Sequence, residues 1–458
     1  MTTFYRYTQA GFRGLIGVAR RDITPPVGIY ARMWGAAKHD KAEGIHRPLT
    51  LTVLTLQQGK RSSAFVLAAL DLGFWQSAED EWFLRGALLK SFKLHPAQVM
   101  INLAHTHAGP AITFAYQDKP GGHLIAPYLH KVRRALLEAT GQALRSATSD
   151  VLTFHSGHCS LARNRDVPDP RRKRIVCGFN PAVPADDTLV VGRVCGKNGR
   201  IMATLVNYAC HPVTLAWQNK LISPDWVGGL REIVEKETAG APCLFLQGNS
   251  GELAPREQYT ADTDVADRHG RQLGYAALSV LEDMLPPASA YVFDRVVESG
   301  AALATWKRTA VRPSNQLKAV VERVNLPLKN LPTIKDYTAQ LSACRNRILA
   351  ERILRKLNIR KTLGDGKTAE VPLWVWRVGE AFMIGQMNEA YSALQLNLRK
   401  IFSGKMILSF NETNGACGYL PPHALYQEDL YQVWQTPFAA GSLEKVTAAA
   451  KNLIEKLS

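Results

Sequence analysis

The first residues in the chain with clear chemical potential are two histidines at the end of an apolar segment. His105 and His107 close the stretch INLAHTHAGPA, residues 101–111, and Gly109-Pro110 then turns the chain away. In an extended chain, side chains two positions apart point to the same side, and α/β folds place their chemistry at the carboxyl ends of strands. The pattern predicts that both imidazoles face one site, although a purely structural pair of histidines gives the same pattern.

A second apolar run ends in the same way. The segment NYACHP, residues 207–212, places His211 directly before a proline. Two histidines on separate strands need a carboxylate to complete a hydrolytic zinc site, because nitrogen and oxygen donors around an open position lower the pKa of bound water. Glu389 is the candidate, since it follows an apolar run and opens a predicted helix over 389–398. A simple first-turn charge is the alternative for Glu389.

A third apolar run, 243–247, leads into the glycine-containing loop GNSGELAP. Its glycines allow backbone amides to converge on an oxyanion, so Asn249, Ser250 and Gly251 are candidate substrate-binding residues. An ordinary tight turn is the alternative. Ser250 lacks the G-x-S-x-G spacing of a serine hydrolase nucleophile, which disfavours that class of enzyme.

Alternating strand and helix patterns must position these residues. Apolar strand-like runs lie at 51–56, 64–70, 99–104, 189–194, 202–208, 243–247, 370–377 and 381–385, and helical patterns lie at 127–144, 227–238, 389–398 and 442–457. Asp225 is the expected N-cap of the second helix. This rhythm is typical of an α/β protein in which both sets of strands share one core. The segment 311–367, rich in Lys and Arg, is predicted to be a mostly helical basic insertion or lid.

The ordered motifs resemble the neutral, non-lysosomal ceramidases, which are zinc amidohydrolases that cleave the N-acyl bond of ceramide. AHTHAGP at 104–110 is similar to the family's T-H-T-H-S-G-P, and NYACHP is similar to its segment ending in His-Pro. Further similar segments are GVARRDITPP at 17–26, ALDL at 69–72, Asn164-Arg165, and GYLPP at 418–422 followed by Tyr431. The resemblance extends from about residue 15 to 457.

The resemblance implies a single large α/β domain over residues 1–458, with mixed sheets in an α-β-β-α layering. It implies Zn²⁺ as the cofactor, with ligands from His105, His211, Glu389 and Tyr419. It also implies that His107, Arg165 and Tyr431 orient the substrate and stabilise charge. We expect no C-terminal immunoglobulin-like domain of the kind that the ceramidases carry.

One segment departs from the family pattern. The family's G-D-x-S-P-N, whose serine has been proposed as important for activity, is here GELAPR, so Ala254 stands at the serine position. Alanine cannot act as a nucleophile, which favours attack by a metal-activated water. The departure also indicates a substrate other than ceramide itself.

Charge and cysteine content bear on partners and location. Lys and Arg outnumber Asp and Glu by 56 to 39, which gives a net charge of +17 and suggests an anionic partner. The densest basic run, RRKR at 171–174, is interpreted as a solvated loop, and no nucleic-acid motif accompanies it, so we expect no nucleic-acid partner. The absence of a readable secretory leader and of a transmembrane run, together with seven scattered cysteines, predicts a cytoplasmic protein.

The sequence therefore predicts a zinc-dependent hydrolase that cleaves a small-molecule or lipid-like acyl amide. An anionic group on the substrate is a further hypothesis, based on Arg165 and the basic segment 311–367. An ester or lactone hydrolase with the same centre is one alternative, because metal-activated water attacks any acyl carbonyl. A non-catalytic protein that binds an anionic partner is the other, and the oligomeric state stays open.

Overall fold

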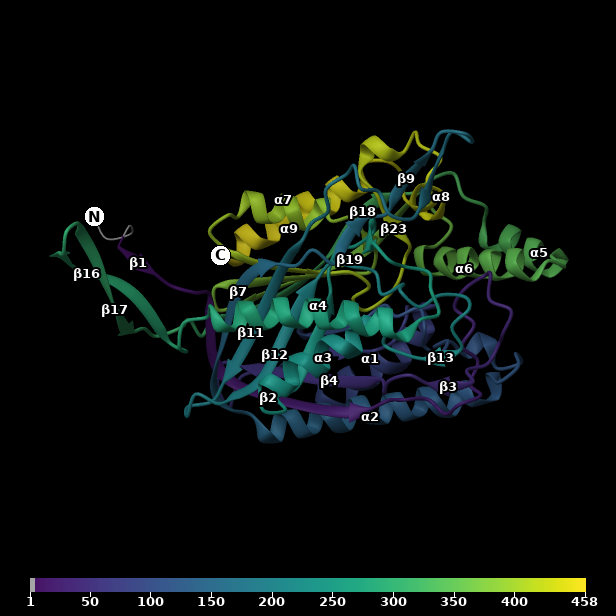
Figure 1. The fold of residues 1–458 in the computed structure, drawn as a ribbon. Coiled ribbons are helices and arrows are strands. Elements are labelled where there is room, and N and C mark those ends of the chain that lie inside the picture. Colours follow the sequence, from purple (N-terminus) through teal and green to yellow (C-terminus); the bar gives the residue numbers. More distant parts are fainter. Residues whose placement is uncertain (1–4) are drawn as a thin grey trace.

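Two β-sheets packed face to face form the centre of the computed structural model, which describes residues 5–458 (Figure 1). The larger sheet contains β2 (Gly11–Asp22), β4 (Thr50–Gln57), β5 (Phe65–Leu70), β6 (Val99–Leu103), β7 (Thr148–His158), β11 (Thr188–Cys195), β12 (Ile201–Tyr208) and β14 (Cys243–Gln247). Its order is β14-β12-β11-β7-β2-β4-β5-β6. The pairs β5–β6 and β12–β14 are parallel and the others antiparallel, so the sheet is mixed and both predicted sets of strands share it.

The smaller sheet covers one face of the larger one. It contains β18 (Leu317–Pro327), β19 (Thr368–Val378), β20 (Ala381–Gln386) and β22 (Met406–Phe410), in that order. Side chains of the two sheets interdigitate in one buried core, where the ring centroids of Phe65 and Trp376 lie 5.1 Å apart. Strand β4, with the sequence TLTVLTLQ, is buried on both faces because this sheet lies on one side and helices lie on the other.

Helices form the two outer layers (Figure 1). The layer on the larger sheet contains α1 (Ala78–Phe92), α2 (Ile125–Ser146), α3 (Trp226–Glu237) and α4 (Thr263–Glu282), and the layer on the smaller sheet contains α7 (Ala393–Ile401) and α9 (Ser442–Leu457). The predicted α-β-β-α layering is therefore confirmed. The Asp225 carboxylate accepts a hydrogen bond from the Trp226 N–H at 2.7 Å, which confirms it as the N-cap of α3. No helix within residues 5–458 is long and apolar enough to span a membrane.

The basic segment 311–367 differs in part from its prediction. Its first part is strand β18, which pairs with β19 along its whole length, so the helical part is limited to α5 (Ile334–Ala343) and α6 (Arg347–Leu363). The charged side chains of β18 are exposed, and from Arg323 to Leu326 exposed and buried side chains alternate, a pattern that indicates a strand with one buried face. Helices α5 and α6 pack on each other through a separate small apolar cluster.

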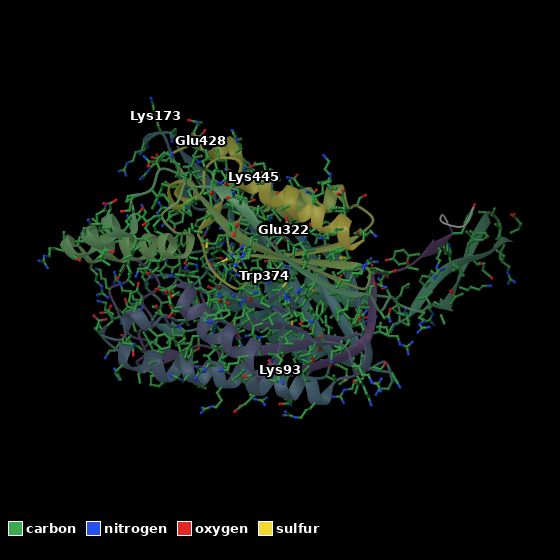
Figure 2. All side chains as sticks on the ribbon, turned by 180° about the vertical axis from the view of Figure 1, so that it is seen from behind. Lys93, Lys173, Glu322, Trp374, Glu428 and Lys445 are labelled. Atoms are coloured by element: carbon green, nitrogen blue, oxygen red, sulfur yellow. The ribbon has the colours of Figure 1, made fainter. Side chains whose placement is uncertain are left out.

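Short elements complete the fold. Strands β1 (Arg6–Tyr7), β16 (Ser289–Glu298) and β17 (Ala302–Ala310) form a largely exposed arm that projects from one end of the molecule (Figure 1). Two-stranded pairs are β3 (Gly44–Ile45) with β13 (Leu221–Ile222), β8 (Ala162–Asn164) with β15 (Leu253–Pro255), β9 (Asp166–Asp169) with β10 (Arg174–Cys177), and β21 (Glu389–Ala390) with β23 (Tyr419–Leu420). The remaining helices are α8 (Tyr431–Gln435) and the 3₁₀ turns η1 (Pro96–Gln98), η2 (Phe114–Tyr116), η3 (Gly122–Leu124) and η4 (His423–Leu425). Lys173, between β9 and β10, points outward, consistent with a solvated basic loop (Figure 2).

A buried ion pair connects the larger sheet to α3. Asp71 lies directly after β5, and each of its two carboxylate oxygens is 2.6 Å from a different guanidinium nitrogen of Arg231. The same carboxylate accepts from the Thr50 N–H at 2.7 Å. Both charged side chains are at least nine-tenths buried. The ALDL segment thus ends its strand on a charge that joins two layers of the fold.

Candidate metal centre

Two strand ends of the larger sheet bring the predicted histidines together. His105 follows β6 with a φ of 67°, and its N–H donates to the Leu72 carbonyl at 2.9 Å. The chain is therefore not extended here, as the spacing argument assumed. The imidazoles of His105 and His107 nevertheless share one site, with their Nε2 atoms 3.2 Å apart. His211 follows β12, and its ring centroid lies 4.8 Å from that of His105.

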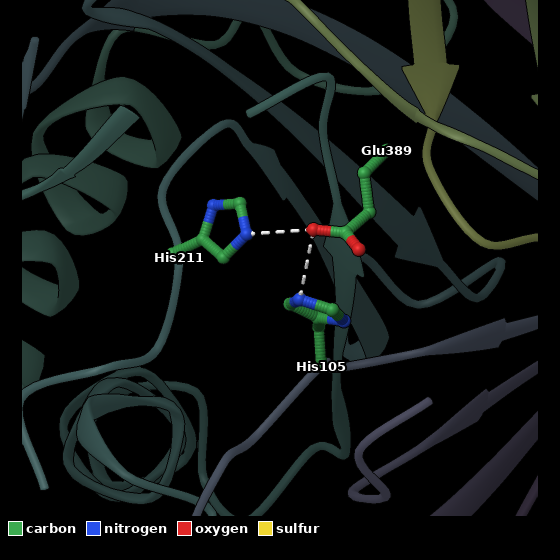
Figure 3. Close-up of side chains that lie close together, drawn as sticks. All are labelled: His105, His211 and Glu389. Carbon is green, nitrogen blue, oxygen red and sulfur yellow. Dashed lines mark hydrogen bonds and ion pairs between the residues drawn. The ribbon is translucent and has the colours of Figure 1, made fainter. Parts of the chain in front are cut away.

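Glu389 places its carboxylate between two of these imidazoles (Figure 3). Its Oε2 lies 3.0 Å from His211 Nε2 and 3.5 Å from His105 Nε2. The potential ligand atoms of the three residues all lie within 4.8 Å of one another. Glu389 does not open a helix, as the sequence predicted, because it pairs with Tyr419 in the short parallel pair β21–β23, and α7 begins only at Ala393.

The outer nitrogen of each of these two histidines is held by an acceptor. His105 Nδ1 lies 2.6 Å from the carboxylate of Glu412, and His211 Nδ1 lies 2.7 Å from the carbonyl oxygen of Ser250. These acceptors fix a proton on Nδ1 of each ring and leave Nε2 facing Glu389, so Nε2 is the nitrogen of each ring that is placed to bind a metal. Two imidazole nitrogens and a carboxylate oxygen, oriented by outer partners, form a donor set that fits a divalent cation such as zinc.

The charges around the centre also favour a cation there. Burial opposes a charge on His105, but Glu412 and Glu389 outweigh it and raise its pKa to about 10. Burial, helped by nearby Arg165, lowers the pKa of His211 to about 3. A positive charge is thus favoured between the two carboxylates, while His211 is kept neutral, the form in which a histidine binds metal.

Arg165 and the two tyrosines lie next to Glu389. Arg165 is buried, and its guanidinium donates to the Gly251 carbonyl at 2.7 Å and to the Tyr419 hydroxyl at 3.2 Å. It forms no ion pair with any carboxylate of residues 5–458. The ring centroids of Tyr419 and Tyr431 lie 5.6 Å apart. The structure therefore brings Arg165, Tyr419 and Tyr431 to the same edge of the centre as Glu389.

The loop at 249–251 lies behind His211, and it turns carbonyl oxygens towards the site where amide N–H groups were predicted. The N–H of Asn249 donates to Gln395 at 3.0 Å, and the N–H of Gly251 donates to the Ala390 carbonyl at 2.9 Å. The carbonyls of Ser250 and Gly251 instead accept from His211 and Arg165. The amides of Asn249 and Gly251 are therefore not free to bind an oxyanion, whereas a substrate-binding role for Ser250 stays a prediction. The carbonyls of the loop support His211 and Arg165.

A buried carboxylate connects this loop to the start of helix α7. Glu252 accepts hydrogen bonds from the N–H and the hydroxyl of Ser392, at the start of α7. Burial raises the pKa of Glu252 to about 7. The loop that supports His211 is thereby held against the segment that carries Glu389.

Glu412 is the residue of the centre that sequence reasoning missed. It lies in the segment NETN, which directly follows the apolar run MILSF of β22. The histidines were identified from the same arrangement, in which polar side chains follow a buried strand. Glu412 could therefore have been found by this criterion, but the segment contains no histidine and was not considered.

The fold itself has known relatives. No family model matches the chain. Among solved structures, a ceramidase complexed with C2 is similar over 98% of this chain and 76% of its own, with a TM-score of 0.69 and 15% identity. The neutral ceramidase from Pseudomonas aeruginosa is similar over 98% of this chain and 75% of its own, with a TM-score of 0.69 and 16% identity. At this identity the likeness establishes the fold, and it confirms the resemblance in fold predicted from the motifs.

Proposed function

We propose that this protein is a divergent ceramidase-like hydrolase that uses zinc to cleave an N-acyl amide bond. The observation that carries the proposal is the convergence of His105, His211 and Glu389, with both outer histidine nitrogens fixed by acceptors. The ceramidase fold around this centre supports an amide as the substrate. Tyr419, the partner of Glu389 across β21–β23, would supply the fourth ligand.

The residues around the metal have distinct proposed roles. A bound Zn²⁺ supplies Lewis-acid polarisation of the acyl carbonyl and lowers the pKa of a water molecule. His107 lies beside the centre, with its Nε2 3.2 Å from His105 Nε2, and this position would let its ring accept a proton from the attacking water. No carboxylate within residues 5–458 forms an ion pair with Arg165, and its guanidinium donates to the developing oxyanion.

Proton and bond changes balance in this scheme. The water oxygen bonds to the acyl carbon, the carbon–nitrogen bond breaks, and His107 passes the proton to the leaving nitrogen, which gives a carboxylic acid and an amine. Gln435 donates to the Tyr431 hydroxyl at 3.3 Å, which leaves the proton of that hydroxyl available to a substrate oxygen. Ala254 is fully buried within β15, which supports water rather than a side chain as the nucleophile.

Metal-dependent turnover tests the function. Protein stripped of metal with a chelator should not hydrolyse N-octanoyl amides, and adding about one equivalent of Zn²⁺ per chain should restore hydrolysis. Full amide hydrolysis by the stripped protein would contradict the proposal. Hydrolysis of a matched octanoyl ester or lactone without any amide hydrolysis would assign the same centre to ester chemistry instead.

Glu412 should strengthen metal binding by orienting His105. In Glu412→Gln the amide keeps the size of the side chain but accepts less strongly from His105 Nδ1, so we expect zinc affinity to fall about 10- to 100-fold. Competition with a zinc-binding dye measures this change. Glu257→Gln, at a half-exposed surface carboxylate, is the matched control. An affinity equal to wild type in Glu412→Gln would remove Glu412 from the centre.

We also infer a cytosolic location and no nucleic-acid partner. All seven cysteines are free thiols, as expected in a reducing compartment. Fractionation of the source cells followed by immunoblotting tests the location, and recovery of the protein outside the cytosol would contradict it.

A further inference from the structure

Arg355, on α6, reaches towards the metal centre from the helical part of the basic segment. Its guanidinium carbon lies 4.7 Å from the centroid of the Phe74 ring. The same ring lies 5.7 Å from the ring of His107 and 6.0 Å from that of His105. Phe74 therefore separates Arg355 from the histidines by one aromatic layer. The Arg355 side chain also keeps access to solvent.

Among the arginines of α6, Arg352 and Arg355 have an aromatic ring as their neighbour and no ion-pair or hydrogen-bond partner within residues 5–458, and Arg355 is the one whose ring, Phe74, lies next to His105 and His107. Arg347 pairs with Asp40, and Arg360 pairs with Asp365 at 3.1 Å. Arg352 lies over the ring of Trp434, with its guanidinium carbon 5.7 Å from the centroid. Among residues 5–458, no carboxylate lies within ion-pair distance of Arg355 and no acceptor hydrogen-bonds to it. All five N–H donors of its guanidinium are thus available to a ligand.

Ion pairs at both ends of α6 surround Arg355, and those of its first half reach a remote segment of the chain. Besides the Arg347–Asp40 and Arg360–Asp365 pairs, Glu351 accepts from Arg32 at 3.0 Å and so ties α6 to the segment before Asp40. The pairs of Arg347 and Glu351 thus connect the first half of α6 to the segment 32–40, and the Arg360–Asp365 pair joins its last turn to the residues that follow the helix. A cation held in place beside an aromatic ring, and facing a centre that already carries Arg165, creates a positive potential that favours an anion.

We propose that Arg355 binds a carboxylate on the amine part of the substrate, so that the preferred substrates are N-acyl amino acids. The amine part is indicated because Arg355 stacks on Phe74, which contacts His107, and the proposed function assigns to His107 the transfer of a proton to the leaving nitrogen. This proposal rests on the proposed function. A guanidinium recognises a carboxylate through two parallel hydrogen bonds, which a neutral hydroxyl cannot accept.

A matched pair of substrates tests the role of Arg355. N-octanoylglycine and N-octanoylethanolamine share the acyl chain and the amide and differ in carboxylate against hydroxymethyl. We expect wild type to prefer the glycine compound by about tenfold or more in kcat/KM, as a hydrogen bond to a charged group provides. In Arg355→Met this preference should largely disappear, mainly through a higher KM for the glycine compound, and Arg355→Lys should keep part of it.

Lys361→Met is the control, since it removes a positive charge from an exposed position on the same helix. This variant should keep the wild-type preference. A wild-type ratio near one, or an equal ratio in wild type and Arg355→Met, would overturn the inference while leaving hydrolysis intact.

Equilibrium binding separates this inference from the function on which it rests. Calorimetric titration of both compounds into zinc-loaded wild type and Arg355→Met needs no turnover. Tighter binding of N-octanoylglycine by wild type that is lost in Arg355→Met, with no hydrolysis of either compound, would retain the anion site and refute the hydrolase. Equal binding of both compounds by wild type would refute the anion site.

Discussion

His105→Ala and His211→Ala are each expected to lose tight zinc binding and hydrolytic activity. Each change removes one of the two imidazoles that face Glu389 and leaves this buried carboxylate with a single histidine neighbour. Loss of an outer partner alone typically costs 10- to 100-fold in metal affinity, so loss of a ligand should cost more than about a hundredfold. Elemental analysis should find about one zinc per wild-type chain and a small fraction of that in each variant.

His158→Ala is the matched control for the histidine variants. His158 is a largely exposed histidine paired with Asp187 at the end of β7. It should therefore keep both zinc and activity. Circular dichroism of all three variants shows whether each is folded. Full zinc content and activity in the folded His105→Ala and His211→Ala variants would exclude a metal centre at these residues.

Asp71→Ala is expected to destabilise the whole domain by about 3–5 kcal/mol, because it leaves the buried guanidinium of Arg231 without its counter-charge. It also leaves the Thr50 N–H without its acceptor. The effect should be global, since the pair connects a strand of the larger sheet to a helix of the outer layer. Urea unfolding followed by tryptophan fluorescence measures the change in the free energy of unfolding.

Two further variants distinguish the cost of leaving a buried charge unpaired from the cost of breaking an ion pair at the surface. Glu257→Ala breaks an exposed pair with Arg268 and should cost no more than about 1 kcal/mol. The double variant Asp71→Ala with Arg231→Met should recover part of the loss, since it removes the unpaired buried charge. A cost for Asp71→Ala equal to that of Glu257→Ala would show that the buried pair contributes little.

Strand ends were the part of the site that could be predicted from the sequence. His105 and His211 each follow a run of apolar residues that has to be buried, and a polar side chain at that point is visible in the sequence. The local conformation at Glu389 was not visible in this way. Its helical pattern continues into α7, whereas its pairing with Tyr419 depends on a contact between segments remote in sequence.

The orientation of the peptide groups in the loop 248–251 was a second feature that the sequence could not predict. The glycines at 248 and 251 indicated a tight loop correctly, but glycine permits either face of a peptide to turn inwards. The contacts of the carbonyls with His211 and Arg165 decide the orientation, and these contacts form only in the folded protein. In β18 the charged residues of the predicted helical insertion are exposed side chains of a strand, and the pairing of this strand with β19 identifies it.

The two histidines of the candidate metal centre, His105 and His211, lie far in sequence from its carboxylates, Glu389 and Glu412. This separation determines when the centre can assemble during protein synthesis. All strands of the larger sheet are complete by Gln247, whereas Glu412 comes 307 residues after His105. At about 5–20 residues per second, a ribosome needs roughly 15–60 s to make the intervening chain. The histidines therefore emerge long before the carboxylates, and the full donor set of the candidate metal centre can assemble only after Glu412 has been synthesised.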